Sequence, residues 1–289
     1  MNTVLVATLG GLGALFLWGV SDWLASKSSK KYDDGSYVNL TLQTSGAVIM
    51  VAILLLSNVG LPNLRQIILL ILTSLFFTFA YLSYIKAFSV GEAGVVVPLA
   101  NIYPLVTLLL TATFLTLSLS GMQTAAVVTI IFGAVLLGTE KLNIRKAKEH
   151  LSLEVGFALL TAALWGAGFF TVNAIVDELP WEVILGAICI TMGLFSIGYY
   201  LYKHRNTKKR QSILRNESGI IAGLALTTGS IAFYVAAEST NNVVIPAVIA
   251  SASPLVTSIL AYIFEGERII LSKRIGALLV VLGVALLNI

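Results

Sequence analysis

Long apolar stretches recur along the whole chain and are separated by short polar breaks. A helix that crosses a bilayer needs about 20 mainly apolar residues. Ten stretches meet this requirement, and the pattern predicts spans at 3–25, 35–57, 65–88, 94–117, 122–139, 153–176, 180–202, 217–238, 243–264 and 272–288. These stretches are apolar on every face, whereas the strands of a membrane barrel alternate apolar and polar residues. We therefore predict an all-α polytopic membrane protein.

Composition excludes a soluble protein. Of the 289 residues, 57% are apolar and 11% are charged, and the mean hydropathy is +0.93. A soluble chain carries about 25% charged residues, which it needs to cover its surface. The longest polar stretches, 140–152 and 203–216, are too short to form a domain. Cys189 is the only cysteine, so an intramolecular disulfide or a cysteine metal cluster is excluded.

The chain contains an internal repeat. The sequence Tyr-Pro-Leu-Val-Thr at 103–107 recurs as Ser-Pro-Leu-Val-Thr at 253–257, and Leu-Trp-Gly at 17–19 recurs at 164–166. We interpret the chain as a five-helix repeat at 1–139, a basic connecting loop at 140–152 and a second five-helix repeat at 153–289. Because five is odd, the second copy must enter the membrane from the opposite side. Such inverted repeats are typical of secondary transporters.

Several motifs together resemble a known family. They are the two Leu-Trp-Gly and two Pro-Leu-Val-Thr sequences, Tyr-Ile-Lys-Ala-Phe-Ser-Val-Gly at 84–91 and Glu-Gly-Glu-Arg at 265–268. In order and duplication they resemble the EamA-type transporters of the drug/metabolite transporter (DMT) superfamily, over nearly the whole chain. The resemblance implies a five-plus-five inverted fold and a cavity lined by the first, third, fourth, sixth, eighth and ninth spans. It also implies movement of small organic metabolites, often by export. The Gly-Glu-Arg sequence has no counterpart in the first repeat.

Four prolines lie in the repeated element. Pro98 and Pro104 belong to the fourth span, and Pro246 and Pro254 belong to the ninth. An interior proline removes a helical hydrogen bond and frees the carbonyl four residues earlier, here those of Ala100 and Ala250. Helix kinks at matching places in both repeats indicate a central binding site. The alternative is a pair of kinks that serve packing alone.

Polar and aromatic residues within the spans are the candidate substrate-binding residues. The repeat pairs Trp18 with Trp165, and both lie inside their spans, where a tryptophan face can hold a cation or a flat ring. The alternative for each residue is ordinary ring packing or an interhelical hydrogen bond. The full set is Trp18, Tyr81, Tyr84, Asn101, Tyr103, Trp165, Tyr234, Ser251 and Ser253.

Three charged residues within or near the spans are candidates for gating or coupling. Asp22 and Lys86 should lie at the same depth, because the first and third spans run in the same direction. We predict that they form an ion pair that acts in a gate or binds a zwitterion, although a lysine near a span end can also reach the interface. Glu238 is the candidate for binding a proton or cation, which makes proton coupling possible.

The basic residues predict an orientation. Of the 18 lysines and arginines, 16 lie in loops predicted on one side, Arg65 lies on the other and Lys86 lies in a span. The positive-inside rule places the basic loops in the cytoplasm and both termini outside. Relatives in the family are thought to keep their termini inside, so the two criteria conflict, and we give the charge bias more weight. The predicted location is the plasma membrane of the cell.

The leading functional hypothesis is a secondary transporter of a small polar or amphipathic metabolite, such as an amino acid or a related compound, with export implied by the resemblance. An alternative is a carrier of quaternary ammonium or nucleobase-like compounds. A third hypothesis is a non-transporting membrane scaffold or receptor. We expect a small-molecule substrate and the lipid bilayer as partners, no nucleic acid, no cofactor or metal, no enzymatic activity, and a monomer or homodimer.

Overall fold

The structure, a computed structural model, describes residues 3–91, 93–115, 120–137, 153–206, 211–266 and 271–287. Among these residues, seven helical segments are long and apolar enough to cross a membrane, and the pair α11 and α12 counts as one of them. The elements are α1 (Thr3–Lys31), α2 (Gly35–Leu56), α3 (Leu64–Val90), α4 (Ala93–Ala100), α5 (Tyr103–Phe114), α6 (Gly121–Leu137), α8 (Leu153–Asn173), α9 (Trp181–Lys203), η2 (Ile213–Arg215), α10 (Glu217–Thr240), α11 (Val244–Ala250), α12 (Pro254–Glu265) and α13 (Leu271–Leu287).

The prediction of an all-helical polytopic membrane protein is confirmed, and most predicted span ends agree with helix ends to within a few residues. The largest difference is at α1, which continues to Lys31, beyond the predicted end at residue 25. This extension buries serines, and the Ser28 hydroxyl donates a hydrogen bond of 2.9 Å to Asn216 Oδ1. Hydropathy does not predict the extension, because its residues are polar and are stabilised by contacts with other parts of the protein instead of contacts with lipid.

Short turns at 101–102 and 251–253, here called the helix breaks, interrupt the fourth and ninth predicted spans. Pro104 and Pro254 lie at the beginning of α5 and α12, where a proline sacrifices no helical hydrogen bond. Pro246 lies in the first turn of α11, and the side chain of Pro98, in α4, lies outside the described residues. The expectation of a free carbonyl at Ala250 is wrong, because this carbonyl accepts a 3.0 Å hydrogen bond from the backbone N–H of Ser253.

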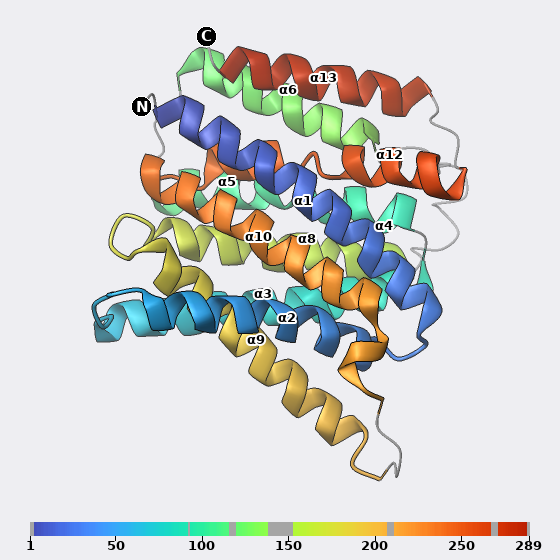
Figure 1. The fold of residues 1–289 in the computed structure, drawn as a ribbon. Helices are drawn as coiled ribbons and strands as arrows, with labels where there is room; N and C mark the ends of the chain where they lie inside the picture. Colours follow the sequence, from blue (N-terminus) through green and yellow to red (C-terminus); the bar gives the residue numbers. More distant parts are fainter. Residues whose placement is uncertain are drawn as a thin grey trace.

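Helices of the N-terminal half (residues 3–137) pack mainly on helices of the C-terminal half (residues 153–287). The most extensive contacts are those of α1 with α10, α3 with α8, α2 with α9 and α6 with α13. Each of these pairs takes one helix from each half, so the two halves interlock along their whole length (Figure 1). The beginning of α1 and the end of α13 lie at the same end of the bundle (Figure 1).

Polar and basic segments from both halves gather at the opposite end of the bundle. The ends of α1 and α9 and the beginnings of α2 and α10 meet there (Figure 1). The Tyr32 and Tyr37 hydroxyls each donate a 2.7 Å hydrogen bond to a backbone carbonyl, of Arg215 and Ser212 respectively. Tyr37 is completely buried, so these bonds fix the connection before α10 against α2.

Asp34 connects α2 to α9 at this end. Its carboxylate caps α2 by accepting hydrogen bonds from the backbone N–H of Ser36 at 3.1 Å and from the Ser36 hydroxyl. Lys203 Nζ lies 2.8 Å from Oδ1, and His204 Nε2 lies 2.7 Å from Oδ2. Partial burial alone would raise the pKa of Asp34, but the hydrogen bonds from Lys203, Ser36 and His204 outweigh it and lower the pKa to about 2.

We expect Asp34→Ala to lower the free energy of unfolding by about 1–2 kcal/mol, the usual cost of losing a helix N-cap. Asp34→Asn keeps a capping side chain and loses the negative charge that faces Lys203 and His204, so its cost should stay below about 1 kcal/mol. Because folding lowers the pKa of Asp34 from 3.8 to about 2, its charge stabilises the protein above pH 4 and loses this effect as the pH falls toward 2. Apparent melting temperatures measured against pH should therefore converge for wild type and Asp34→Asn at low pH. A constant difference down to pH 2.5 would contradict this assignment.

Candidate substrate site

A cavity lies where α1, α3, α8 and α10 meet the two helix breaks. The atoms around it leave about 360 Å³ of empty space, a volume that includes the opening. Its lining consists of Trp18 and Asp22 from α1, Phe77 and Tyr81 from α3, Asn101 and Tyr103 at the first break, Trp165 and Phe169 from α8, Leu226 from α10 and Ser253 at the second break. Six of the nine predicted substrate-binding residues line this cavity, together with Asp22.

Three polar side chains connect the two breaks across the cavity. The Ser253 hydroxyl lies 3.3 Å from Asp22 Oδ2 and 3.2 Å from Asn101 Oδ1, and its single proton can serve one of them at a time. The Asn101 amide donates a 2.8 Å hydrogen bond to the Val97 carbonyl, which fixes its oxygen toward Ser253. The arrangement leaves acceptor oxygens of Asp22 and Asn101 available to a ligand that donates hydrogen bonds.

Asp22 supplies the only formal charge among the residues that line the cavity. Tyr84 lies close enough to interact with its carboxylate, although the Tyr84 hydroxyl makes no hydrogen bond of good geometry. The predicted ion pair of Asp22 with Lys86 is absent from the described part of the chain. Lys86 is exposed, and Asp22 faces Ser253 from the other half of the chain. The cavity acid therefore has no cationic partner among the lining residues.

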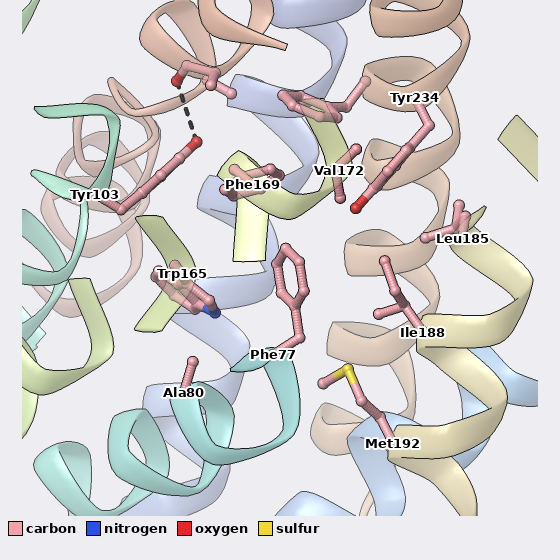
Figure 2. Close-up of a cluster of buried hydrophobic side chains, with 14 of the residues drawn as sticks. Phe77, Ala80, Tyr103, Trp165, Phe169, Val172, Leu185, Ile188, Met192 and Tyr234 are labelled. Carbon is pink, nitrogen blue, oxygen red and sulfur yellow. Dashed lines mark hydrogen bonds between the residues drawn. The ribbon is translucent and has the colours of Figure 1, made fainter. Parts of the chain in front are cut away.

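Aromatic rings form most of the remaining wall. Trp165 contacts Tyr81, Tyr84 and Tyr103 in edge-on arrangements, with ring centroids 5.3, 4.9 and 5.9 Å apart. Figure 2 shows Trp165, Phe169 and Tyr103 close together, with Phe77 beside them. Trp18 stands on α1, and its ring centroid is 6.2 Å from that of Phe169. The two tryptophans that the repeat pairs thus line one cavity.

The two indole N–H groups differ in their partners. Trp18 Nε1 lies 3.2 Å from the Leu226 carbonyl and 3.2 Å from the Ser230 hydroxyl. Trp165 Nε1 is buried and has no hydrogen-bond partner. A buried N–H without a partner is rare in folded proteins, because it loses its bond to water and gains nothing in return.

Equivalent residues of the two halves join the helices that follow the two breaks to α1 and α8: α12 contacts α1, and α5 contacts α8. The Thr257 hydroxyl lies 3.1 Å from the Gly19 carbonyl, and the Thr107 hydroxyl lies 3.2 Å from the Gly166 carbonyl. At both glycines an added Cβ atom would collide with the valine that precedes the threonine and with a backbone carbonyl. Only glycine allows helices to approach this closely.

The other predicted site residues lie outside the cavity lining. Tyr84 stands behind Trp165, and the Ser251 hydroxyl donates to the Val248 carbonyl at 2.7 Å. Tyr234 is buried, packs on Phe233 and has an unpaired hydroxyl, and it lies away from Trp165 (Figure 2). Glu238 is half-buried in the last turn of α10, close to Glu182.

Three lining residues were absent from the prediction, namely Phe77, Phe169 and Leu226. Helical spacing could have identified two of them, because residues four apart share a helix face. Phe77 lies four residues before Tyr81, and Phe169 lies four residues after Trp165. Leu226 carries no such signal.

Comparisons with known proteins agree with this architecture. The EamA-like transporter family matches the chain twice, at residues 5–139 and 152–289. One similar crystal structure, described only as "Crystal structure of protein", superimposes with a TM-score of 0.72 over 98% of each chain; at 20% identity this likeness shows the fold alone. No curated protein matches. The resemblance inferred from the motifs is confirmed, and the match indicates a transporter of small molecules rather than an enzyme. The chain belongs to the EamA-like transporter family.

Proposed function

We propose that this protein is a secondary transporter that moves a small, ammonium-bearing organic metabolite across the plasma membrane by alternating access. The observation that carries the proposal is the Asp22 carboxylate, which lies among aromatic rings in a central cavity and has no cationic partner in the described lining. A charged group withdrawn from water requires an opposite charge or a proton. A substrate ammonium group satisfies this requirement.

The aromatic lining favours the same class of substrate. Trp18, Tyr81 and Trp165 are among the lining residues, and aromatic rings bind cations through cation–π interactions, which are strongest with tryptophan. Among the compounds of the two transport hypotheses from the sequence, amino-acid-related and quaternary ammonium compounds share a positively charged nitrogen, whereas nucleobase-like compounds lack one. We therefore propose a substrate with a positively charged nitrogen.

Alternating access follows from the relation that we propose between the halves. We propose ten spans arranged as two inverted repeats, 1–139 and 153–289, joined by the loop at 140–152. The double family match supports this arrangement, and so do the equivalent contacts of Thr107 with Gly166 and of Thr257 with Gly19. Exchange of the two conformations between the halves would open the cavity to one side and then to the other.

Orientation, direction and coupling complete the proposal. The basic segments 27–31, 203–206 and 211–215 lie at one end of the bundle, which supports a cytoplasmic location for this end and outside termini. Export is the direction that the family resemblance implies. We propose a proton as the coupling ion, with Glu238 as a candidate site besides the cavity.

The test is counterflow in liposomes that contain the purified protein. Liposomes preloaded with an unlabelled ammonium compound, such as choline or phenethylamine, should accumulate the radiolabelled compound faster than protein-free liposomes. Carboxylates of similar size, such as 3-phenylpropionate, should not exchange. A pH-sensitive dye in the lumen reports proton movement in the same preparation. Exchange of carboxylates with no exchange of any ammonium compound would overturn the proposed substrate class.

A further inference from the structure

The cavity offers a ligand more than a negative charge. Besides the Asp22 carboxylate, its lining contains hydrogen-bond donors and acceptors. Those that have no partner within the protein indicate which groups a ligand must supply. The following inference rests on the proposed function, because it concerns the substrate of the same site.

One polar donor of the lining is buried and unpaired. Trp165 has 7% of its surface exposed, lines the cavity, and its Nε1–H has no partner. Figure 2 shows this nitrogen on the side of the ring that faces Phe77, another lining residue. By contrast, Trp18 Nε1 and the Tyr103 hydroxyl already donate to backbone carbonyls of the protein. A hydrogen-bond acceptor on the ligand would give the Trp165 indole N–H the partner that it lacks within the protein.

The charge of the lining restricts the nature of that acceptor. No lysine, arginine or histidine is among the described residues that line the cavity. A free carboxylate on the ligand would bring a second negative charge near Asp22 with no basic side chain of the lining to offset it, and like charges repel strongly where water is scarce. The acceptor therefore has to be uncharged, for example a hydroxyl, an ester, an amide or a ring carbonyl.

We propose that the cavity selects organic cations that carry an ammonium group for Asp22 and an uncharged hydrogen-bond acceptor for the Trp165 indole N–H, and that it discriminates against amino acids with a free carboxylate. Trp165 acts as the specificity-determining residue and Asp22 as the anchor. This inference narrows the leading sequence hypothesis, because it excludes unmodified amino acids from the preferred substrates.

Three compounds that share a phenethylammonium unit test the inference. Phenylalaninol has an ammonium and a hydroxyl group, phenethylamine has the ammonium alone, and phenylalanine has an ammonium and a carboxylate. Binding is measured by calorimetry on the purified full-length protein. We expect phenylalaninol to bind about tenfold more tightly than phenethylamine, which corresponds to one hydrogen bond of about 1.4 kcal/mol, and phenylalanine to bind most weakly.

Trp165→Phe removes the indole N–H and keeps an aromatic ring. This variant should bind phenylalaninol and phenethylamine equally, and retained binding of phenethylamine demonstrates that it is folded. Trp181→Phe is the matched control, because Trp181 is absent from the cavity lining, and it should keep the tenfold preference.

The outcomes separate this inference from the proposed function. Equal binding of phenylalaninol and phenethylamine by the wild type, or a preference that survives in Trp165→Phe, would overturn the role of Trp165 and leave the transport of organic cations standing. Binding of phenylalanine as tight as that of phenylalaninol would overturn the exclusion of carboxylates. No binding of any of the three compounds would contradict both proposals.

Discussion

Asp22→Asn should reduce transport and binding of organic cations by about a hundredfold or more, because removal of one partner of a buried charge pair costs about 3–5 kcal/mol. The substitution preserves the size of the side chain and its ability to accept a hydrogen bond from Ser253, so the fold should persist. What it removes is the only formal charge of the cavity lining. The measurement is radiolabel counterflow in liposomes, combined with calorimetric binding to the same purified variant.

Asp33→Asn is the matched control for this experiment. Asp33 is exposed between α1 and α2, so this variant loses the same charge outside the cavity and should transport normally. Asp22→Glu restores the charge with one additional methylene group and should retain part of the activity. Transport by Asp22→Asn at the wild-type rate, at equal protein content, would show that Asp22 does not bind the substrate.

Gly166→Ala should have the second largest effect, with a loss of about 1–3 kcal/mol or more in the free energy of unfolding. The added methyl group would meet the Val106 side chain and the backbone carbonyl of Tyr103. A side chain can rotate away from such a collision, but a backbone carbonyl cannot, so α8 must separate from α5. Separation also breaks the hydrogen bond from Thr107 to the Gly166 carbonyl. Both the apparent melting temperature and counterflow should fall.

The same helix provides the control. Gly156 also lies in α8, but an added Cβ atom there meets no atom within 4 Å. Gly156→Ala should therefore leave transport unchanged and should leave stability unchanged or raise it by up to about 1 kcal/mol, because alanine is the better helix former. Equal stability and equal counterflow of Gly166→Ala and Gly156→Ala would show that the close approach of α8 and α5 contributes to neither property.

The sequence predicted the helices well because their main determinant is local. A membrane helix requires an uninterrupted apolar stretch, and each stretch can be recognised without knowledge of its neighbours. The end of α1 was predicted less well, because its last turn depends on Asn216, which is 188 residues away from Ser28. The breaks at 101–102 and 251–253 were visible only as prolines, since the hydropathy of each span continues through the break.

The candidate site shows where sequence reasoning fails. The position of a residue within a span predicts its depth in the membrane, and on this basis Asp22 and Lys86 were predicted to lie at the same depth. Contact also depends on rotation about the helix axis. Lys86 follows Tyr81 by five residues, which turns it about 140° away from the cavity face. Asp22 follows Trp18 by four residues and so stays within about 40° of the same face. Helix rotation therefore disfavours the ion pair and places Phe77 and Phe169 on the faces that line the cavity.

The interlocked packing has a consequence for how the protein is made. Helix α1 contacts α10, α11 and α12 more extensively than any helix of its own half, and α8 packs chiefly on α3, α4 and α5. During synthesis, the first half therefore enters the membrane before the helices that will cover its glycine-lined faces exist. The main native contacts of α1 form only after α10 to α12 have been translated, because they join residues far apart in the chain. Until then the nascent helices expose close-packing surfaces to lipid and to other chains, so assembly is a late step that depends on completion of the whole polypeptide.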